Sequence, residues 1–240
     1  MKKILSLFLL VVLFTLSFAA CGKKTDTDAS GEASASLPAP ADDPFAEQKQ
    51  ILSLFESFTV AGSSGFDYSS EQTQGNTVVN RHTVSVRLDS SNGSGSRVEY
   101  KKNLNEDLSG DQYTELESTT YYQNGKIAVR ENGVWTWKSG TLAEFVTVNL
   151  QSFRLDYAAL RDVSLTASGE TKTLTFRIDD ANAAAFLGVS QPIKNLSFEI
   201  KTDADCKRLV SFAMTYAQEL TATVFRFTPY TGSATVTLPD

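Results

Sequence analysis

Histidine is almost absent from this chain, which contains only His82. A serine-type triad needs a histidine base, and no G-x-S-x-G sequence supplies a matching nucleophile, so His82 is interpreted as a surface histidine. A zinc site needs three or four ligands, which one histidine and two cysteines do not provide. The sequence therefore predicts a protein that is not an enzyme, with no catalytic residue, metal or cofactor. A two-carboxylate hydrolase is the enzymatic alternative left open, because any two of 28 acidic residues can meet in a fold.

Long hydrophobic runs are also scarce, since residues 4–18 form the only one. This run has about 15 residues, fewer than the roughly 20 that a membrane-spanning helix needs. Lys2 and Lys3 precede it, and Ala19 and Ala20 follow it. A positive start, a short apolar run and small residues are the three parts of a secretory signal peptide. Residues 1–20 are therefore predicted to be an export signal.

The residues Phe18-Ala19-Ala20-Cys21-Gly22 resemble the lipobox of bacterial lipoproteins, with phenylalanine where leucine is usual. The resemblance implies cleavage before Cys21 and a diacylglyceryl group on its sulfur, carrying palmitate-like chains. Two acyl chains make a durable anchor. The expected location is the extracytoplasmic face of the cell membrane, with the lipid on Cys21 as the membrane contact.

Negative charge exceeds positive charge in the exported chain. Removal of Lys2 and Lys3 with the signal changes the formal net charge from −6 to −8. Because so acidic a chain is a poor partner for phosphates, no nucleic acid is expected to bind. Cys206 has no cysteine to pair with once Cys21 is acylated, and it is interpreted as a surface cysteine in a turn.

The segment after Cys21 has almost no large apolar residues. Within residues 21–43 the only large one is Leu37, and the rest are mostly Ser, Ala, Asp, Thr, Pro and Lys. Such a segment cannot bury enough surface to offset the entropy of ordering, so a disordered tether is predicted. Residues 44–240 are then predicted to form a single domain of roughly 195 residues.

Helix signals occur at three places in this domain. Asp43-Pro44 suits a helix start, and the residues that follow, to about Gly62, place their apolar side chains on one half of a helical wheel. Thr141 and Glu144 have the spacing of a capping box. Asp179 can cap a third helix that Gly188 closes. Residues 156–161 are a candidate for a fourth, one-turn helix.

Elsewhere the apolar period is two, which is typical of strands. Asn-Gly pairs at 92–93, 124–125 and 132–133 predict type I′ hairpins, and residues 234–238 read as a closing strand. The predicted fold class is α+β, with a large antiparallel sheet of about 10–11 strands. A sheet of this size is expected to curl, with three or four helices packed on its concave face.

The order of these segments resembles a known family. The lipobox, tether and first helix are followed by the 121–126 hairpin, a strand with Trp135, the 176–179 strand-to-helix step, the 203–209 hairpin and residues 235–239. Together they are similar to the periplasmic lipoprotein carrier and the mycobacterial lipid-binding lipoproteins. The resemblance covers most of residues 44–240 and implies a half-barrel with a hydrophobic cavity that holds acyl chains.

Aromatic residues are the candidate cavity lining, since ligand pockets are mostly apolar. The candidates are Phe55, Phe58, Trp135, Trp137, Phe176, Phe198, Phe212, Met214, Tyr216 and Phe225. The expected function is non-catalytic binding of a lipid or other hydrophobic ligand by a membrane-anchored lipoprotein. The alternative is a structural or signalling envelope module of the same fold, with a filled core and a protein partner whose identity the sequence does not indicate.

Overall fold

The computed structural model describes residues 43, 45–57, 64–105, 112–147 and 159–239. The predicted export signal, Cys21, Phe58 and all of the tether except its last residue lie outside this range, as do residues 156–158 of the predicted fourth helical turn. The rest of that prediction is wrong, because Leu160 and Arg161 begin a strand, β7 (Leu160–Ser168). Among the described residues, no helix has the length and apolar character needed to cross a membrane.

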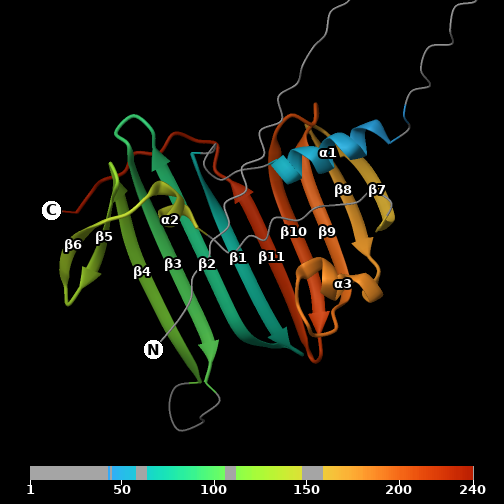
Figure 1. Ribbon diagram of the computed structural model, residues 1–240, viewed down its shortest axis with the longest axis horizontal. Coiled ribbons are helices and arrows are strands. Elements are labelled where there is room, and N and C mark those ends of the chain that lie inside the picture. The colour runs from blue at the N-terminus through green and yellow to red at the C-terminus, as the bar shows by residue number, and fades with distance from the viewer. Residues whose placement is uncertain (1–42, 44, 58–63, 106–111, 148–158, 240) are drawn as a thin grey trace, which may run out of the picture. The chain divides into compact units, whose positions relative to one another are not determined.

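Eleven antiparallel strands form one sheet (Figure 1). The first six strands are a meander: β1 (Gly65–Gln74), β2 (Thr77–Asp89), β3 (Ser94–Leu104), β4 (Tyr113–Gln123), β5 (Lys126–Glu131) and β6 (Val134–Ser139). The other five are a second meander: β7 (Leu160–Ser168), β8 (Thr171–Ile178), β9 (Lys194–Asp203), β10 (Leu209–Gln218) and β11 (Thr221–Pro229). Pairing of β1 with β11 joins the two meanders, so β6 and β7 are the edge strands.

Three helices lie on one face of this sheet (Figure 1). They are α1 (Ala46–Ser57), α2 (Leu142–Val146) and α3 (Asp180–Leu187). The antiparallel sheet and the three helices confirm the coarse fold prediction. The sheet is open.

Local sequence signals explain the helix ends. The capping box is confirmed, because the Glu144 amide donates to the Thr141 hydroxyl at 3.2 Å and the Thr141 amide donates to the Glu144 carboxylate at 2.7 Å. Gly188 ends α3 in the left-handed region, with φ of 65°. Asp179 is the N-cap of α3, but its side chain makes no capping hydrogen bond and instead pairs with Arg161 at 3.0 Å.

Two of the three predicted Asn-Gly hairpins are confirmed. Both residues of each pair at 124–125 and 132–133 have positive φ, as a type I′ turn requires. The pair at 92–93 instead ends a four-residue loop between β2 and β3. The Asp89 carboxylate accepts hydrogen bonds from the backbone amides of Ser91 and Asn92 there, at 3.1 and 3.3 Å, and these bonds favour a longer turn.

Two expectations about the C-terminal half are wrong. Residues 234–238 form no strand, and β11, the strand before them, is already paired with β1 and β10 on both sides. Cys206 is buried, with 3% exposure, although it does lie in a turn. The turn packs under α1, where the Gln50 amide donates to the Cys206 carbonyl at 3.2 Å.

Candidate functional site: the helix-bearing face of the sheet

Seven residues in register cross seven neighbouring strands on the face that carries the helices. We call this set the amphiphilic row: Lys101, His82, Ser70, Phe225, Met214, Phe198 and Phe176. Side chains of directly paired residues lie on the same face of a sheet, so all seven share one face. The row is polar on β3, β2 and β1 and apolar from β11 to β8.

Burial increases along the row from its polar to its apolar end. The side chains of Lys101 and His82 are 47% and 29% exposed. Phe225 is half-buried, whereas Met214 and Phe176 are buried. The row therefore begins at the solvent and ends in the hydrophobic core.

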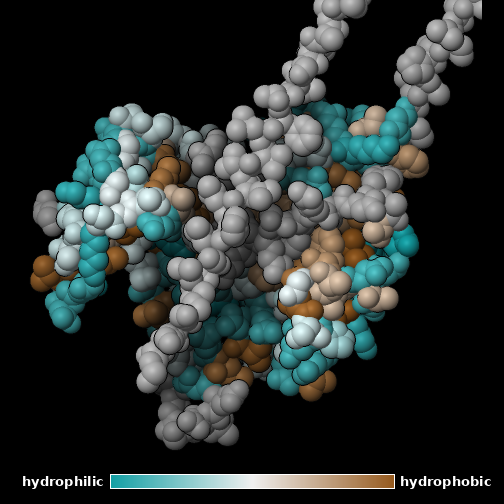
Figure 2. Space-filling model, in the orientation of Figure 1, coloured by the Kyte–Doolittle hydropathy of each residue, from teal (hydrophilic) through white to brown (hydrophobic). Residues whose placement is uncertain are grey.

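The core lies between the apolar half of the sheet, α1 and α3. Ile51 and Leu52 of α1 and Leu187 of α3 are buried in it. Figure 2 shows hydrophobic side chains gathered between α1 and α3, with hydrophilic side chains around them. Alternation of apolar and polar residues along β8 to β11 produces this arrangement, because only one face of each strand meets the helices.

Aromatic rings fill this core in contact with one another. Phe227 stacks on Phe66 and on Phe212, with ring centroids 5.2 and 5.6 Å apart. Phe176 stacks on Phe198 at 4.9 Å, and Phe55 of α1 meets Phe212 edge-on at 5.0 Å. These separations are within the range of favourable aromatic pairs, so the core is filled by the protein's own side chains.

A second set of rings links the core to the polar end of the row. Tyr216 stacks on Phe225 at 6.1 Å, and Phe225 lies 6.2 Å from Tyr68. Tyr68 in turn meets His82 edge-on at 5.7 Å. Tyr216 and Phe225 are only half-buried. A continuous aromatic surface therefore leads from β10 to β2, partly open to solvent.

Charged residues surround the polar end. We call Arg97, Glu99, Lys101 and His82 the charged cluster. The Glu99 carboxylate pairs with His82 at 2.7 Å, with Lys101 at 2.8 Å and with Arg97 at 3.2 Å. Arg97 also donates to the carbonyls of Phe145 and Thr147 at 3.1 and 2.8 Å, which ties the end of α2 to β3. The cluster thus fixes both the cations and α2.

Burial alone raises the pKa of Glu99, but hydrogen bonds from Lys101 and His82 and the charge of Arg97 outweigh it and lower the pKa to about 2. Because the folded-state pKa lies below the usual value of 4.5, the ionised carboxylate stabilises the fold above that pH. The stabilisation is lost as the pH falls through 2. The Glu99 carboxylate therefore stays ionised over the physiological range.

Replacing Glu99 by glutamine is expected to lower the free energy of unfolding by roughly 2 kcal/mol at pH 7, the scale of lost hydrogen bonds to a charged group. The difference from the parent protein should narrow between about pH 5 and pH 2, because the parent carboxylate becomes protonated there. Urea denaturation at a series of pH values measures the difference in the free energy of unfolding between the variant and the parent protein. Glu115→Gln, at an exposed carboxylate on the opposite face, is the matched control and should change little. If the loss of unfolding free energy in Glu99→Gln is the same at every pH, the ionised Glu99 carboxylate is not the source of the stabilisation.

The predicted lining residues separate into three groups. Phe55, Phe176, Phe198, Phe212, Met214, Tyr216 and Phe225 all belong to the core or pack against it. Phe58 lies outside the described residues. Trp135 and Trp137 share a face, as expected, but it is the face opposite the helices, since Trp137 pairs with Ala128 and Ala128 with Tyr121. There Trp135 meets Tyr121 edge-on at 5.2 Å.

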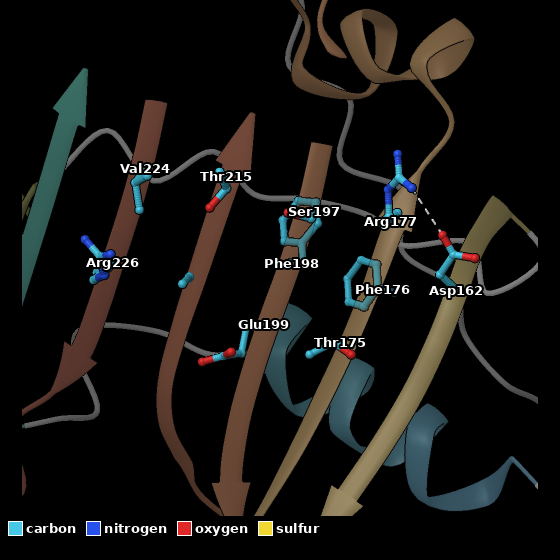
Figure 3. A pocket seen from close by; sticks show the side chains of 11 residues that line it. Asp162, Thr175, Phe176, Arg177, Ser197, Phe198, Glu199, Thr215, Val224 and Arg226 are labelled. Carbon is cyan, nitrogen blue, oxygen red and sulfur yellow. Dashed lines mark hydrogen bonds and ion pairs between the residues drawn. The ribbon is translucent and has the colours of Figure 1, made fainter. Parts of the chain in front are cut away.

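The opposite face of the sheet carries a separate hollow of about 530 Å³ (Figure 3). Most of its lining consists of polar and charged side chains on β8 to β11, including Arg177, Glu199 and Arg226. Arg177 pairs with Asp162 at 3.4 Å. Phe176 and Phe198 also border the hollow, but they are buried members of the core. The hollow thus lies across the sheet from the core, and most of the side chains around it are polar.

Sequence reasoning missed the charged cluster. His82 was expected at the surface, and the structure places it half-buried between Glu99 and Tyr68. Charged residues at 97, 99 and 101 alternate along one strand and so share a face, but their meeting with His82 depends on the β2–β3 register. Within the described ranges, no group of three or more His, Cys, Asp or Glu side chains is placed to hold a metal ion.

Comparison with known proteins finds similarity only at the level of structure. No family model and no curated protein sequence matches the chain. LppX of Mycobacterium tuberculosis has a TM-score of 0.38 and 14% identity, over 81% of this chain and 97% of that one. LprF of Mycobacterium bovis has a TM-score of 0.42 and 15% identity, over 82% and 97%. A LolA superfamily protein of Nitrosomonas europaea has a TM-score of 0.23 and 8% identity, over 75% and 90%. The predicted resemblance is confirmed in this sense: the chain is similar in structure to mycobacterial lipoproteins and to the LolA superfamily fold, at low sequence identity.

Proposed function

We propose that this chain is a membrane-anchored extracytoplasmic lipoprotein that binds a lipid or other hydrophobic ligand on the helix-bearing face, without catalysis. The observation that supports the proposal is the amphiphilic row, which runs from exposed cations on β3 to buried rings on β8. An amphiphile has the same division into a polar and an apolar part. A half-barrel curl of the sheet would wrap this face around the ligand.

Binding would be passive in this proposal. The core is filled by its own rings, so an acyl chain would enter where Phe225 and Tyr216 are half-buried and would displace α1 or α3 from the sheet. Phe55 on α1 and Phe186 on α3 touch the rings of β9 and β10, and acyl chains would take their place. Burial of apolar surface, at about 25 cal/mol per Å², would drive the exchange.

The filled core favours one alternative, a structural or signalling module of the same fold that contacts a protein partner. Stacked rings such as Phe66 and Phe227, both fully buried, need no ligand to complete them. In that case the helix-bearing face would be closed, and added lipid would find no place between helices and sheet.

Neighbouring residues on β11 provide a sharp test. Phe225 lies on the helix-bearing face, and Val224 lies on the opposite face, where it borders the polar hollow. Phe225→Asp is expected to weaken binding of a fluorescent fatty acid by about tenfold or more, because it places a charge where the chain would be buried. Val224→Asp should leave the affinity unchanged. Circular dichroism verifies the fold of both variants. Equal affinities for the parent protein and Phe225→Asp would count against the proposal.

A further inference from the structure

We infer that the charged cluster is the subsite for the head group of the bound amphiphile, and that this head group is anionic. The inference rests on the proposed function and adds the class of ligand to it. The observation behind it is the change from cationic to aromatic side chains within one register of the sheet.

The geometry orients an amphiphile along the row. Lys101, His82 and Ser70 occupy three successive strands, and Phe225 occupies the next. With strands about 4.8 Å apart, Lys101 and Phe225 are separated by about 14 Å. A head group at Lys101 therefore leaves its chain to run over Tyr68 and Phe225 towards the core. The reverse orientation would place a polar group among the buried Met214 and Phe198.

Charge balance selects an anionic head group. The chain as a whole is acidic, with a formal net charge of −6. The charged cluster nevertheless contains two permanent cations, Arg97 and Lys101, and a histidine around the single carboxylate of Glu99. Its formal charge is therefore +1 with His82 neutral. A cationic head group placed here would be repelled by Lys101. An anionic head group would not be repelled in this way, because the Glu99 carboxylate is already paired with the cluster's own side chains.

Within the part of the chain that the structure describes, donors also remain free at the cluster. An ammonium group has three donors, and Glu99 accepts from Lys101 at one contact of 2.8 Å. His82 contacts Glu99 through Nε2, and its Nδ1 has no hydrogen-bond partner among the described residues. Arg97 has a different role, because its hydrogen bonds to the carbonyls at the end of α2 hold that helix at the border of the site. Lys101 and His82 are thus the groups that would donate to a phosphate or carboxylate.

The test compares two adjacent lysines of β3. Lys101 is on the helix-bearing face, and Lys102 is on the opposite face, where it pairs with Glu115 at 2.7 Å. Both are changed to glutamine in the mature full-length chain carrying Cys21→Ser. Calorimetry below the micellar range measures three probes: dodecyl phosphate, neutral dodecyl maltoside and inorganic phosphate. Lys101→Gln is expected to weaken dodecyl phosphate binding about tenfold, the effect of losing one hydrogen bond to a charged group. Lys102→Gln should not weaken it, and dodecyl maltoside should bind both variants like the parent.

Each other outcome has a distinct meaning. Equal binding of both amphiphiles to the parent, with no effect of Lys101→Gln, would overturn the head-group assignment and leave the proposed function standing. Binding of neither amphiphile would overturn the proposed function and this inference together. Binding of inorganic phosphate as tightly as dodecyl phosphate would show an anion site that does not need the chain, and would overturn the assignment to an amphiphile. His82→Gln is a second variant at the same subsite, and an unchanged affinity in both His82→Gln and Lys101→Gln would also overturn it.

Discussion

Replacing Phe227 by alanine is expected to lower the free energy of unfolding by about 3–5 kcal/mol. Phe227 is fully buried on β11, the strand that pairs with β1 and so joins the two meanders. Its ring stacks on Phe66 and Phe212, so its loss leaves a cavity between both halves of the sheet. Urea denaturation followed by circular dichroism measures the change.

Leu220→Ala is the control for this prediction. Leu220 lies in the turn that leads into β11 and is 76% exposed, so its truncation should change stability by no more than about 0.5 kcal/mol. A loss below about 1 kcal/mol for Phe227→Ala would mean that the neighbouring rings collapse into the space. The core would then be too adaptable for Phe227 to hold the two meanders together.

Replacing Cys21 by serine is expected to remove the protein from the membrane fraction almost completely. The proposed anchor is the lipid on the Cys21 sulfur, and serine offers no thiol for the thioether. The remaining chain is acidic, so anionic lipid head groups would not retain it by general charge attraction. Metabolic labelling with palmitate measures the loss of the lipid, and cell fractionation measures the loss of membrane association.

Cys206→Ser is the matched control, because Cys206 is the other cysteine of the chain and is buried in the core. Labelling and membrane attachment should both persist in this variant. Labelling that survives in Cys21→Ser and is lost in Cys206→Ser would refute the proposed anchor. Retention of unlabelled Cys21→Ser protein on membranes would instead indicate a contact other than the lipid.

Local sequence patterns predicted most of the sheet. Alternating apolar residues indicated the strands, and two Asn-Gly pairs gave their hairpins, because positive φ at both positions favours these residues directly. The third pair was overridden by Asp89, whose carboxylate competes for the loop amides. The false closing strand at 234–238 has a different cause. Its residues alternate properly, but alternation does not show whether a neighbouring strand is in place to pair, and the preceding strand β11 is already paired on both sides.

The candidate site was predictable only in part. Periodicity shows that Trp135 and Trp137 share a face, but it does not show which face meets the helices, and they lie opposite them. The amphiphilic row combines residues more than 140 positions apart, from Ser70 to Phe225, through the β1–β11 pairing. No local signal encodes that pairing. The charged cluster was missed for the same reason, since His82 and Glu99 belong to different strands.

Native mass spectrometry is the most direct test of the proposal that this face holds an amphiphile. The mature chain with Cys21→Ser has no thiol at position 21 to carry a lipid. Any lipid mass found with this protein after purification from a bacterial host is therefore bound non-covalently. We expect a fraction of the protein to carry one added mass that dissociates as an intact anionic lipid, and Phe225→Asp to lose it. A clean protein mass, unchanged after incubation with membrane lipids, would contradict the proposal and favour the module with a filled core.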